Sequence, residues 1–261
     1  MKLALVYAGN VATDAEKSLA RRLGLLLIAP GQTEKLQIDF YLRYEPEGLS
    51  LYCDHNGATG AVRVDFSDAK LNYRLADATR NQNIVKAIGL KRTESQQRLT
   101  LLDATAGLGK DAYLIASLGC EVQMLERSPI VHALLEDGLQ RGLKGSSGIA
   151  EAVGRMRLAH DDFALGNKDL PPVDVVYLDP MFPLRKKSAR VKKDMFLLQR
   201  LLGSDEDDPK LLEAALRLAR KRVVVKRAKL SAYLTARKPD IEFKGSSSRY
   251  DVYLKLQGAS D

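Results

Sequence analysis

The apolar positions of the first 70 residues recur mainly with the period of β-strands. Apolar and polar residues alternate in Leu36–Phe40 and in Val62–Phe66, and a period of two places all apolar side chains of a strand on one face. A helix is expected to begin at the capping residue Thr13 or Asp14 and to end at Arg22. The expected strands are 3–7, 25–28, 35–42, 49–54 and 59–66.

From about residue 80 the pattern changes to helices that alternate with strands. Val173–Leu178 is apolar at nearly every position, which is typical of a strand buried on both faces of a parallel sheet. The expected helices are 83–88, 110–117, 129–139 and 209–220, and the expected strands are 99–102, 121–125, 156–159, 173–178, 223–225 and 250–256. We therefore expect a doubly wound, Rossmann-like α/β domain over residues 76–261, preceded by a small α+β domain over residues 1–75.

Composition limits the class of protein. Of the 261 residues, 45% are apolar and 28% are charged, which excludes a disordered chain or a disulfide-rich scaffold. The uncharged run Leu23–Pro30 is too short to span a bilayer. The chain has two cysteines and three widely spaced histidines, which show no metal-ligand spacing. A cytoplasmic protein without a metal or a membrane partner is expected.

The positive charge of the chain is concentrated in one region. The net charge is +8, but residues 185–229 alone contain 15 Lys/Arg against 6 Asp/Glu. A charge run is usually a solvated face. Here six cations within the nine residues 185–193, with no acidic residue inside the run, favour a loop that binds a polyanion. The predicted RNA-binding residues are Arg185, Lys186, Lys187, Arg190, Lys192, Lys193, Lys226 and Arg227.

A glycine-containing loop is expected where the strand 99–102 leads into the helix 110–117. Gly107 and Gly109 allow a ligand to approach the backbone closely, and the helix N-terminus offers N–H groups. Glu126 follows Asp103 by 23 residues, at the end of the next strand. A carboxylate there can accept hydrogen bonds from both ribose hydroxyls. The pattern predicts a cofactor that contains a nucleoside.

Two cofactors fit this loop. The spacing Gly107-x-Gly109-x-x-Ala112 satisfies a dinucleotide fingerprint, so a nicotinamide-dependent oxidoreductase stays open. However, Asp103 precedes the glycines, and a carboxylate suits a cation better than a phosphate. S-adenosylmethionine has an α-amino group and a sulfonium but no pyrophosphate. The simplest alternative is a tight turn that Asp103 caps.

A second motif follows the buried strand 173–178. Asp179-Pro180-Met181-Phe182 is similar to the signature of methyltransferases that act on exocyclic amines of bases. The carboxylate and the Pro180 carbonyl can each accept an N–H of the amine as it becomes pyramidal and charged, and Phe182 can stack on the base. An ordinary loop with an Asx-Pro turn is the alternative.

Taken together, these strings resemble the RsmJ family, the bacterial small-subunit ribosomal RNA guanine-N2 methyltransferases. The resemblance covers roughly residues 80–257 and implies a class I methyltransferase fold, S-adenosylmethionine as cofactor and methylation of one guanine in 16S-type RNA, either naked or in the assembled subunit. The matching strings are Asp103–Asp111, Met124–Arg127, Tyr177–Pro183, Lys187–Ala189, Val191–Lys193 and Val223–Arg227.

By position, the resemblance assigns cofactor contacts to residues that the loop and the motif already suggest. They are Lys110, Asp111, Glu126, Arg127 and Asp179, with Asp162 and Phe163 where the family has small hydroxyl residues. The family's glycine-rich stretch ahead of the first catalytic helix reads Ala78–Asn83 in this chain. A methyltransferase for another nucleic-acid amine and a non-catalytic RNA-binding assembly factor remain alternative functions.

Overall fold

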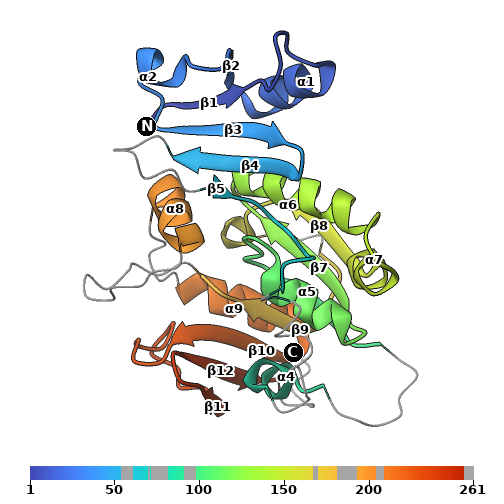
Figure 1. Cartoon of the computed structure of the whole chain (residues 1–261). Helices are drawn as coiled ribbons and strands as arrows, with labels where there is room; N and C mark the ends of the chain where they lie inside the picture. Colours follow the sequence, from blue (N-terminus) through green and yellow to red (C-terminus); the bar gives the residue numbers. More distant parts are fainter. Residues whose placement is uncertain are drawn as a thin grey trace. The chain divides into compact units, whose positions relative to one another are not determined.

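The computed structural model forms two compact units, each discontinuous in sequence. It describes residues 1–53, 61–69, 71, 82–90, 98–166, 170–180, 193–203 and 209–255. The first unit comprises residues 1–65, 128–141 and 183–204, and the second comprises 66–127, 142–182 and 205–261. Figure 1 shows the elements of both units along the chain.

The first unit contains a five-stranded mixed sheet in the order β2-β1-β3-β4-β5. Its strands are β1 Leu3–Val6, β2 Leu26–Ile28, β3 Phe40–Glu45, β4 Gly48–Cys53 and β5 Ala61–Val62. β1 is parallel to β2 and β3, and the rest of the sheet is antiparallel. The structure therefore confirms that the N-terminal segment is rich in strands.

Helix α1, Asp14–Leu23, begins as its sequence predicts. The Thr13 hydroxyl accepts a hydrogen bond from the backbone of Glu16, and the Glu16 carboxylate accepts one from the backbone of Thr13. This reciprocal pair satisfies two N–H groups that would otherwise lack partners at the helix start. Gly24 ends the helix in the left-handed region, at φ 64°.

The predicted strand 35–42 is wrong in its first half. A short helix, α2 Thr33–Leu36, occupies this place, and Gln37 ends it in the left-handed region at φ 53°. Ile38 is buried without being part of a strand, and β3 starts at Phe40. A period of two in apolar residues therefore arose here from a helix end followed by a loop. Of the predicted strand 59–66, the described part contains only β5.

Helix α6, Pro129–Gly142, groups mainly with the N-terminal sheet. The Asp137 carboxylate accepts a hydrogen bond from the backbone N–H of Leu49 at 3.0 Å, and the Arg141 guanidinium donates to the carbonyl of Val64 at 2.5 Å. Helix α8, Lys193–Leu202, belongs to the same unit and is absent from the sequence prediction. This grouping differs from a single boundary at residue 75, because a helical pattern reveals an apolar face but not the sheet that it covers.

The second unit contains a seven-stranded sheet in the order β11-β12-β10-β9-β6-β7-β8. Its strands are β6 Thr100–Asp103, β7 Glu121–Glu126, β8 Met156–His160, β9 Val173–Leu178, β10 Ala219–Ala228, β11 Ile241–Lys244 and β12 Ser248–Leu254. The five strands from β10 to β8 run parallel, and β12 is antiparallel to β10 and β11. This topology confirms the predicted doubly wound α/β fold.

The strand order has a switch point between β6 and β9: β7 and β8 follow on one side of β6, and β9 and β10 follow on the other. The described helices of the unit are α4 Asn83–Ile88, α5 Lys110–Ser117, α7 Ser147–Gly154, α9 Pro209–Leu218 and the 3-10 turn η1 Phe163–Leu165. Since crossovers between parallel strands are right-handed, α5 and α9 cover opposite faces. Leu211, Leu212 and Ala215 of α9 pack on Val176 and Val223. The reversal places the switch point of the sheet at the carboxyl ends of β6 and β9, where open α/β sheets bind ligands.

No helix in the described part of the chain combines the length and the apolar character needed to cross a membrane.

Candidate active site

The two motifs found in the sequence meet at the carboxyl ends of β6 and β9. Asp103 is the last residue of β6 and lies beside Tyr177 of β9, and Asp179 directly follows β9. The backbone N–H of Asp179 donates a hydrogen bond of 2.6 Å to the hydroxyl of Thr105. The glycine-containing loop is thus fixed to the Asp179–Pro180 segment through Thr105.

The glycine-containing loop is also fixed to the end of β7. The N–H of Gly107 donates a 2.9 Å hydrogen bond to a carboxylate oxygen of Glu126. Gly107 and Gly109 have φ angles of 54° and 68°, a region that L-residues with a side chain rarely adopt. A Cβ built on Gly107 would have no closer neighbour than the Thr105 carbonyl at 4.0 Å. The loop therefore has open space on this side, as backbone approach by a ligand requires.

Lys226 lies in this site rather than on an RNA-facing surface. Its neighbour Val225 pairs with Leu178, so the parallel register places Lys226 beside Asp179. The Lys226 amine is 2.7 Å from a carboxylate oxygen of Asp179 and 2.7 Å from one of Asp111, and its side chain is 26% exposed. These ion pairs occupy the amine, which corrects the prediction that Lys226 binds phosphate.

Tyr177 of β9 is a buried member of the same cluster. Its side chain is fully buried, and its hydroxyl donates a 2.8 Å hydrogen bond to the same Asp111 oxygen that Lys226 contacts. Burial, followed by the charges of Asp111 and Asp179, raises the pKa of Tyr177 well above its ordinary value. Tyr177 therefore stays a hydrogen-bond donor, and it holds the Asp111 carboxylate in place.

The pKa values of the charged groups reflect burial and mutual repulsion. Burial raises the pKa of Asp103 to about 8, with smaller contributions from Asp111 and Asp179 that oppose a hydrogen bond from Thr105. Burial also raises the pKa of Asp179, while Lys226 acts against it. For Lys226, burial lowers the pKa, but the two carboxylates outweigh it and raise the pKa above the ordinary value. Lys226 is therefore protonated at neutral pH.

The raised pKa of Asp103 predicts a pH-dependent effect of replacing it by asparagine. The unfolded chain releases this proton near pH 3.8 and the folded chain near pH 8, so the unfolded state binds fewer protons in that window and stability falls as pH rises. Asp103→Asn removes this slope and keeps an oxygen for the N–H of Thr105. Thermal unfolding should show the variant gaining stability over the unmodified chain from pH 5 to pH 9. A difference in melting temperature between the variant and the unmodified chain that stays constant from pH 5 to pH 9 would contradict the raised pKa of Asp103.

The other predicted cofactor residues lie near Glu126 but differ in what their side chains do. The N–H of Asp161 donates to the Glu126 carbonyl at 3.2 Å, which places the segment after β8 beside the end of β7. The Asp162 carboxylate caps η1 through the N–H of Ala164. Phe163 is buried in a core cluster that contains Ala104, Leu125 and residues of α9. The carbonyl of Arg127 lies 3.0 Å from a ring nitrogen of His160.

The structure also tests part of the predicted RNA surface. Arg227 is 3% exposed, and its guanidinium donates to the carbonyl of Ala232, which corrects its prediction as a phosphate contact. Lys193 is the first residue of α8, and its side chain lies outside the described part. Phe182 and the cations Arg185, Lys186, Lys187, Arg190 and Lys192 also lie outside the described residues.

Sequence reasoning missed three groups of this site. Thr105 and Tyr177 stood inside the two motifs without an assigned role, and Lys226 was assigned to RNA by its charge alone. A usable signal was present for Lys226, because it follows the apolar run Val223–Val225. A residue at the carboxyl end of a buried parallel strand is expected at the ligand-binding edge.

The charges of the site fit S-adenosylmethionine. The carboxylates of Asp111 and Asp179 outnumber the single ammonium of Lys226, and the nearby Asp103, whose pKa burial raises to about 8, would release its proton more readily beside a bound cation, so the cluster favours a cationic ligand. Glu126 stands at the end of β7, where a carboxylate can bind ribose hydroxyls. In the described residues, no group of three or more His, Cys, Asp or Glu side chains is arranged to hold a metal ion.

Comparisons with known proteins agree with this architecture. A family model described as "Putative SAM-dependent methyltransferase" matches residues 25–255. The chain is 46% identical to the ribosomal RNA small subunit methyltransferase J of Pseudomonas syringae pv. syringae over 93% of this chain and 89% of that protein. It is 41% identical to the protein of the same name from Coxiella burnetii, over 97% and 96% of the two chains.

A solved structure has the same fold over nearly the whole chain. The crystal structure of a SAM-dependent methyltransferase from Neisseria gonorrhoeae is similar with a TM-score of 0.71 and 32% sequence identity, and the match covers 98% of each chain. The similarity includes the N-terminal segment, where the sequence motifs are absent.

Proposed function

This chain belongs to the SAM-dependent methyltransferase family that includes the small-subunit ribosomal RNA methyltransferases J, and from that premise we propose that it methylates the exocyclic N2 amine of one guanine in small-subunit ribosomal RNA. The observation that carries the proposal is the meeting of Asp179–Pro180 with the glycine-containing loop at the switch point of the sheet. The ribosomal RNA substrate comes from the relatives' names, an exocyclic amine as acceptor comes from the chemistry of the Asp179–Pro180 segment, and the N2 of guanine is what the resemblance to the RsmJ family implies.

The residues that would hold the cofactor surround the end of β6. The glycine-containing loop would cradle it, Glu126 would bind its ribose, and Asp103 with Asp111 would face its positive charges. The chemistry that S-adenosylmethionine supplies when bound is an electrophilic methyl group on a sulfonium sulfur. Nothing in this reaction requires a covalent nucleophile from the protein, since alignment of the two reactants alone can supply roughly 7–11 kcal/mol of barrier reduction.

Asp179 and Pro180 would activate the amine by accepting its hydrogen atoms. The exocyclic amine of guanine is conjugated with the ring and is a poor nucleophile. Two acceptors, the Asp179 carboxylate and the Pro180 carbonyl, favour the pyramidal nitrogen that attacks and stabilise the positive charge that develops on it. The Asp179 side chain is 37% exposed, so it is accessible to a base. It can then accept the proton that the methylated nitrogen releases.

Methyl transfer to defined acceptors tests the proposal. Methyl-labelled S-adenosylmethionine is incubated with unmodified small ribosomal subunits, naked small-subunit ribosomal RNA and duplex DNA, and the nucleosides are analysed by mass spectrometry. We expect label in N2-methylguanosine from a ribosomal acceptor and none from DNA.

Two outcomes would contradict the proposal in different ways. Label in another nucleoside of the ribosomal RNA would overturn the assignment of the amine and leave the substrate standing. Cofactor binding without transfer to either ribosomal acceptor would overturn the substrate.

A further inference from the structure

The segment that follows β10 leaves the sheet at the edge where the parallel strands end, and side-chain hydrogen bonds hold its backbone although it forms no helix or strand. The 12 residues between β10 and β11, 229–240, contain no helix or strand. The first four, Lys229–Ala232, which we call the ledge, continue directly from the carboxyl end of β10. They follow Lys226 by three to six residues and form a turn closed by a hydrogen bond from the Ser231 N–H to the Ala228 carbonyl, so they lie within about 20 Å of Lys226, the reach of six extended residues. The Lys226 amine is 2.7 Å from a carboxylate oxygen of Asp179.

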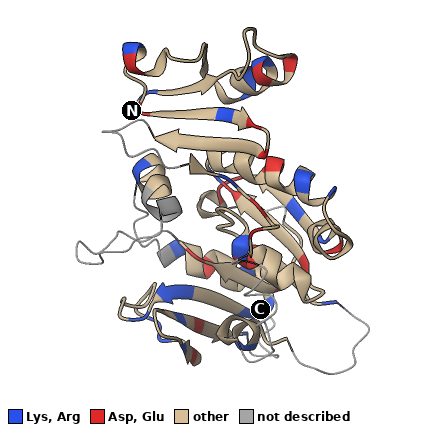
Figure 2. Ribbon diagram, in the orientation of Figure 1, with Lys and Arg blue, Asp and Glu red and all other residues tan. Residues whose placement is uncertain are grey.

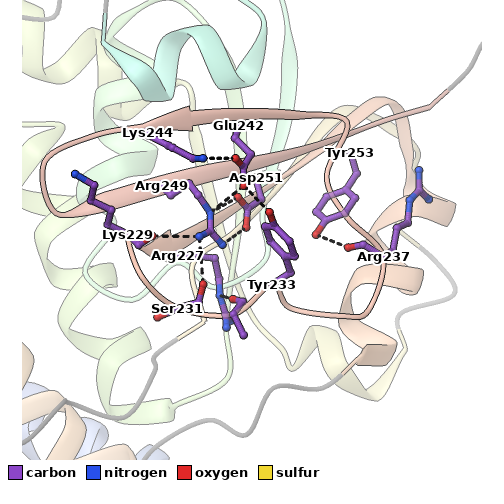
Figure 3. A network of polar contacts seen from close by, with 11 residues as sticks. Arg227, Lys229, Ser231, Tyr233, Arg237, Glu242, Lys244, Arg249, Asp251 and Tyr253 are labelled. Atoms are coloured by element: carbon purple, nitrogen blue, oxygen red, sulfur yellow. Dashed lines mark hydrogen bonds and ion pairs between the residues drawn. The ribbon is translucent and has the colours of Figure 1, made fainter.

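Two arginines hold the backbone of the ledge through its carbonyl groups. The Arg249 guanidinium donates to the carbonyls of Lys229 and Ser231, both at 3.2 Å, and the Arg227 guanidinium donates to the carbonyl of Ala232 at 2.9 Å. Figure 3 shows both arginines reaching the ledge from neighbouring strands. The N–H of Lys229 also donates to the carbonyl of Ser247 in the β11–β12 turn. Three of the four ledge carbonyls therefore have charged donors.

Arg249 is itself fixed by a buried ion pair. Two of its nitrogens donate to the two carboxylate oxygens of Asp251 at 2.6 and 2.9 Å, and Asp251 is completely buried. The Tyr233 ring packs against the guanidinium with its centroid 4.8 Å away. A buried ion pair adds little net stability compared with apolar side chains of similar size. The ion pair with Asp251 instead fixes the orientation of the Arg249 guanidinium, so that its remaining N–H groups donate to the ledge carbonyls.

The ledge presents a cation and an apolar side chain to solvent. Lys229 is exposed, and its amine points away from the polar network in Figure 3. Leu230 is 75% exposed. A single exposed leucine is common on protein surfaces, but this one is held on a backbone that two arginines fix, at the edge of the sheet that carries Asp179. In Figure 2, Lys and Arg mark the neighbouring strand β10 in blue.

We propose that the ledge is a preformed RNA-binding element, in which Lys229 contacts a phosphate and Leu230 contacts a base next to the target nucleotide. This proposal rests on the proposed function, since it takes ribosomal RNA as the partner. A base that enters a methyltransferase site must leave its stack, and proteins fill such gaps with apolar side chains while cations hold the backbone. A rigid ledge loses little conformational entropy when RNA binds.

The test measures the affinity for unmodified small-subunit ribosomal RNA as a function of salt, independently of turnover. Lys229→Ala should weaken binding and reduce the slope of log K against log salt by about 1, as expected for one lost phosphate contact. Leu230→Ala should weaken binding roughly 3- to 10-fold, less than the loss of an aromatic side chain stacked on a base because leucine has no π-face, and leave the slope unchanged. Lys255→Ala is the matched control. Lys255 is exposed and follows the end of β12, which is antiparallel to β10, so it lies where the parallel strands begin and not where they end.

A second variant tests the role of the arginine. Arg249→Met combined with Asp251→Leu replaces the buried pair by apolar side chains and releases the carbonyls of Lys229 and Ser231. We expect a folded protein, as judged by thermal unfolding and cofactor binding, with RNA affinity reduced at least 3-fold. Unchanged affinity in this folded variant would overturn the role of rigidity, and if the variant does not fold, the two surface variants decide.

The outcomes separate the ledge from the proposed function. Methyl transfer by the unmodified chain together with unchanged affinity in Lys229→Ala and Leu230→Ala would overturn the ledge alone. Weakened binding in both variants, with a reduced salt slope in Lys229→Ala alone and no methyl transfer by the unmodified chain, would support the ledge and overturn the function.

Discussion

Asp179→Ala should lower the single-turnover rate of methyl transfer by about 10²–10³-fold, the usual effect of removing one preorganised group that stabilises transition-state charge. The backbone N–H of Asp179 keeps its hydrogen bond to Thr105 in this variant, so the Pro180 carbonyl should keep its place. The measurement uses saturating cofactor and RNA, since Asp179 is also among the predicted cofactor contacts.

Two further measurements identify the role of Asp179. RNA affinity should change less than 3-fold, because one side chain at the bottom of the site contributes little to a large phosphate-dominated interface. Asp179→Asn keeps one oxygen that accepts an N–H, and we expect it to retain more activity than the alanine variant. A single-turnover rate within 3-fold of normal in Asp179→Ala would exclude Asp179 from the chemistry.

Lys226→Met should slow methyl transfer roughly 10-fold or more at pH 7 and displace its pH profile to higher pH. The Lys226 amine lies 2.7 Å from both Asp111 and Asp179, and it acts against the burial that raises the pKa of Asp179. Without this cation, the two carboxylates repel each other and Asp179 holds its proton to a higher pH. A protonated Asp179 loses acceptor capacity for the amine, so the rate recovers only as pH rises.

The pH profile separates an electrostatic role of Lys226 from a structural one. Lys226→Arg keeps the charge and should restore the pH profile toward that of the unmodified chain, even if the larger guanidinium lowers the maximum rate. A reduced rate in Lys226→Met with an unshifted profile would show that Lys226 only supports the fold. RNA affinity and its salt slope should stay unchanged, in contrast to Lys229→Ala.

The sequence alone predicted most of the catalytic domain, because its signals are local. The apolar run Val173–Leu178, the glycines at 107 and 109 and the cap at Thr13 each determine the conformation of their own segment. In a doubly wound sheet, the carboxyl ends of parallel strands meet at one edge. A common edge for Asp103, Glu126 and Asp179 therefore followed from the parallel sheet, and the order β9-β6-β7 found in the structure makes their strands neighbours.

Errors arose where a local pattern had two explanations. Leu36, Ile38 and Phe40 alternate as in a strand, yet Leu36 ends a helix and Ile38 is buried in a loop. The cationic run Arg220–Arg222 and the pair Lys226–Arg227 both appear in the sequence as short clusters of positive charge, so their charge did not mark Lys226 and Arg227 as residues with partners inside the fold. Charge does not reveal burial, since a buried cation needs a partner that can come from any part of the chain.

The tertiary structure alone decided which distant groups share one hydrogen bond or one ion pair. Lys226 reaches Asp111 across 115 residues of sequence and Asp179 across 47, and Arg249 reaches back to Lys229 and Ser231. The strands, the loop glycines and the family could be identified from the sequence, because backbone conformation and hydrophobic period depend on neighbouring residues. The charge state of the site and the rigidity of the ledge depend on strand register and burial, which exist only once the sheet has formed.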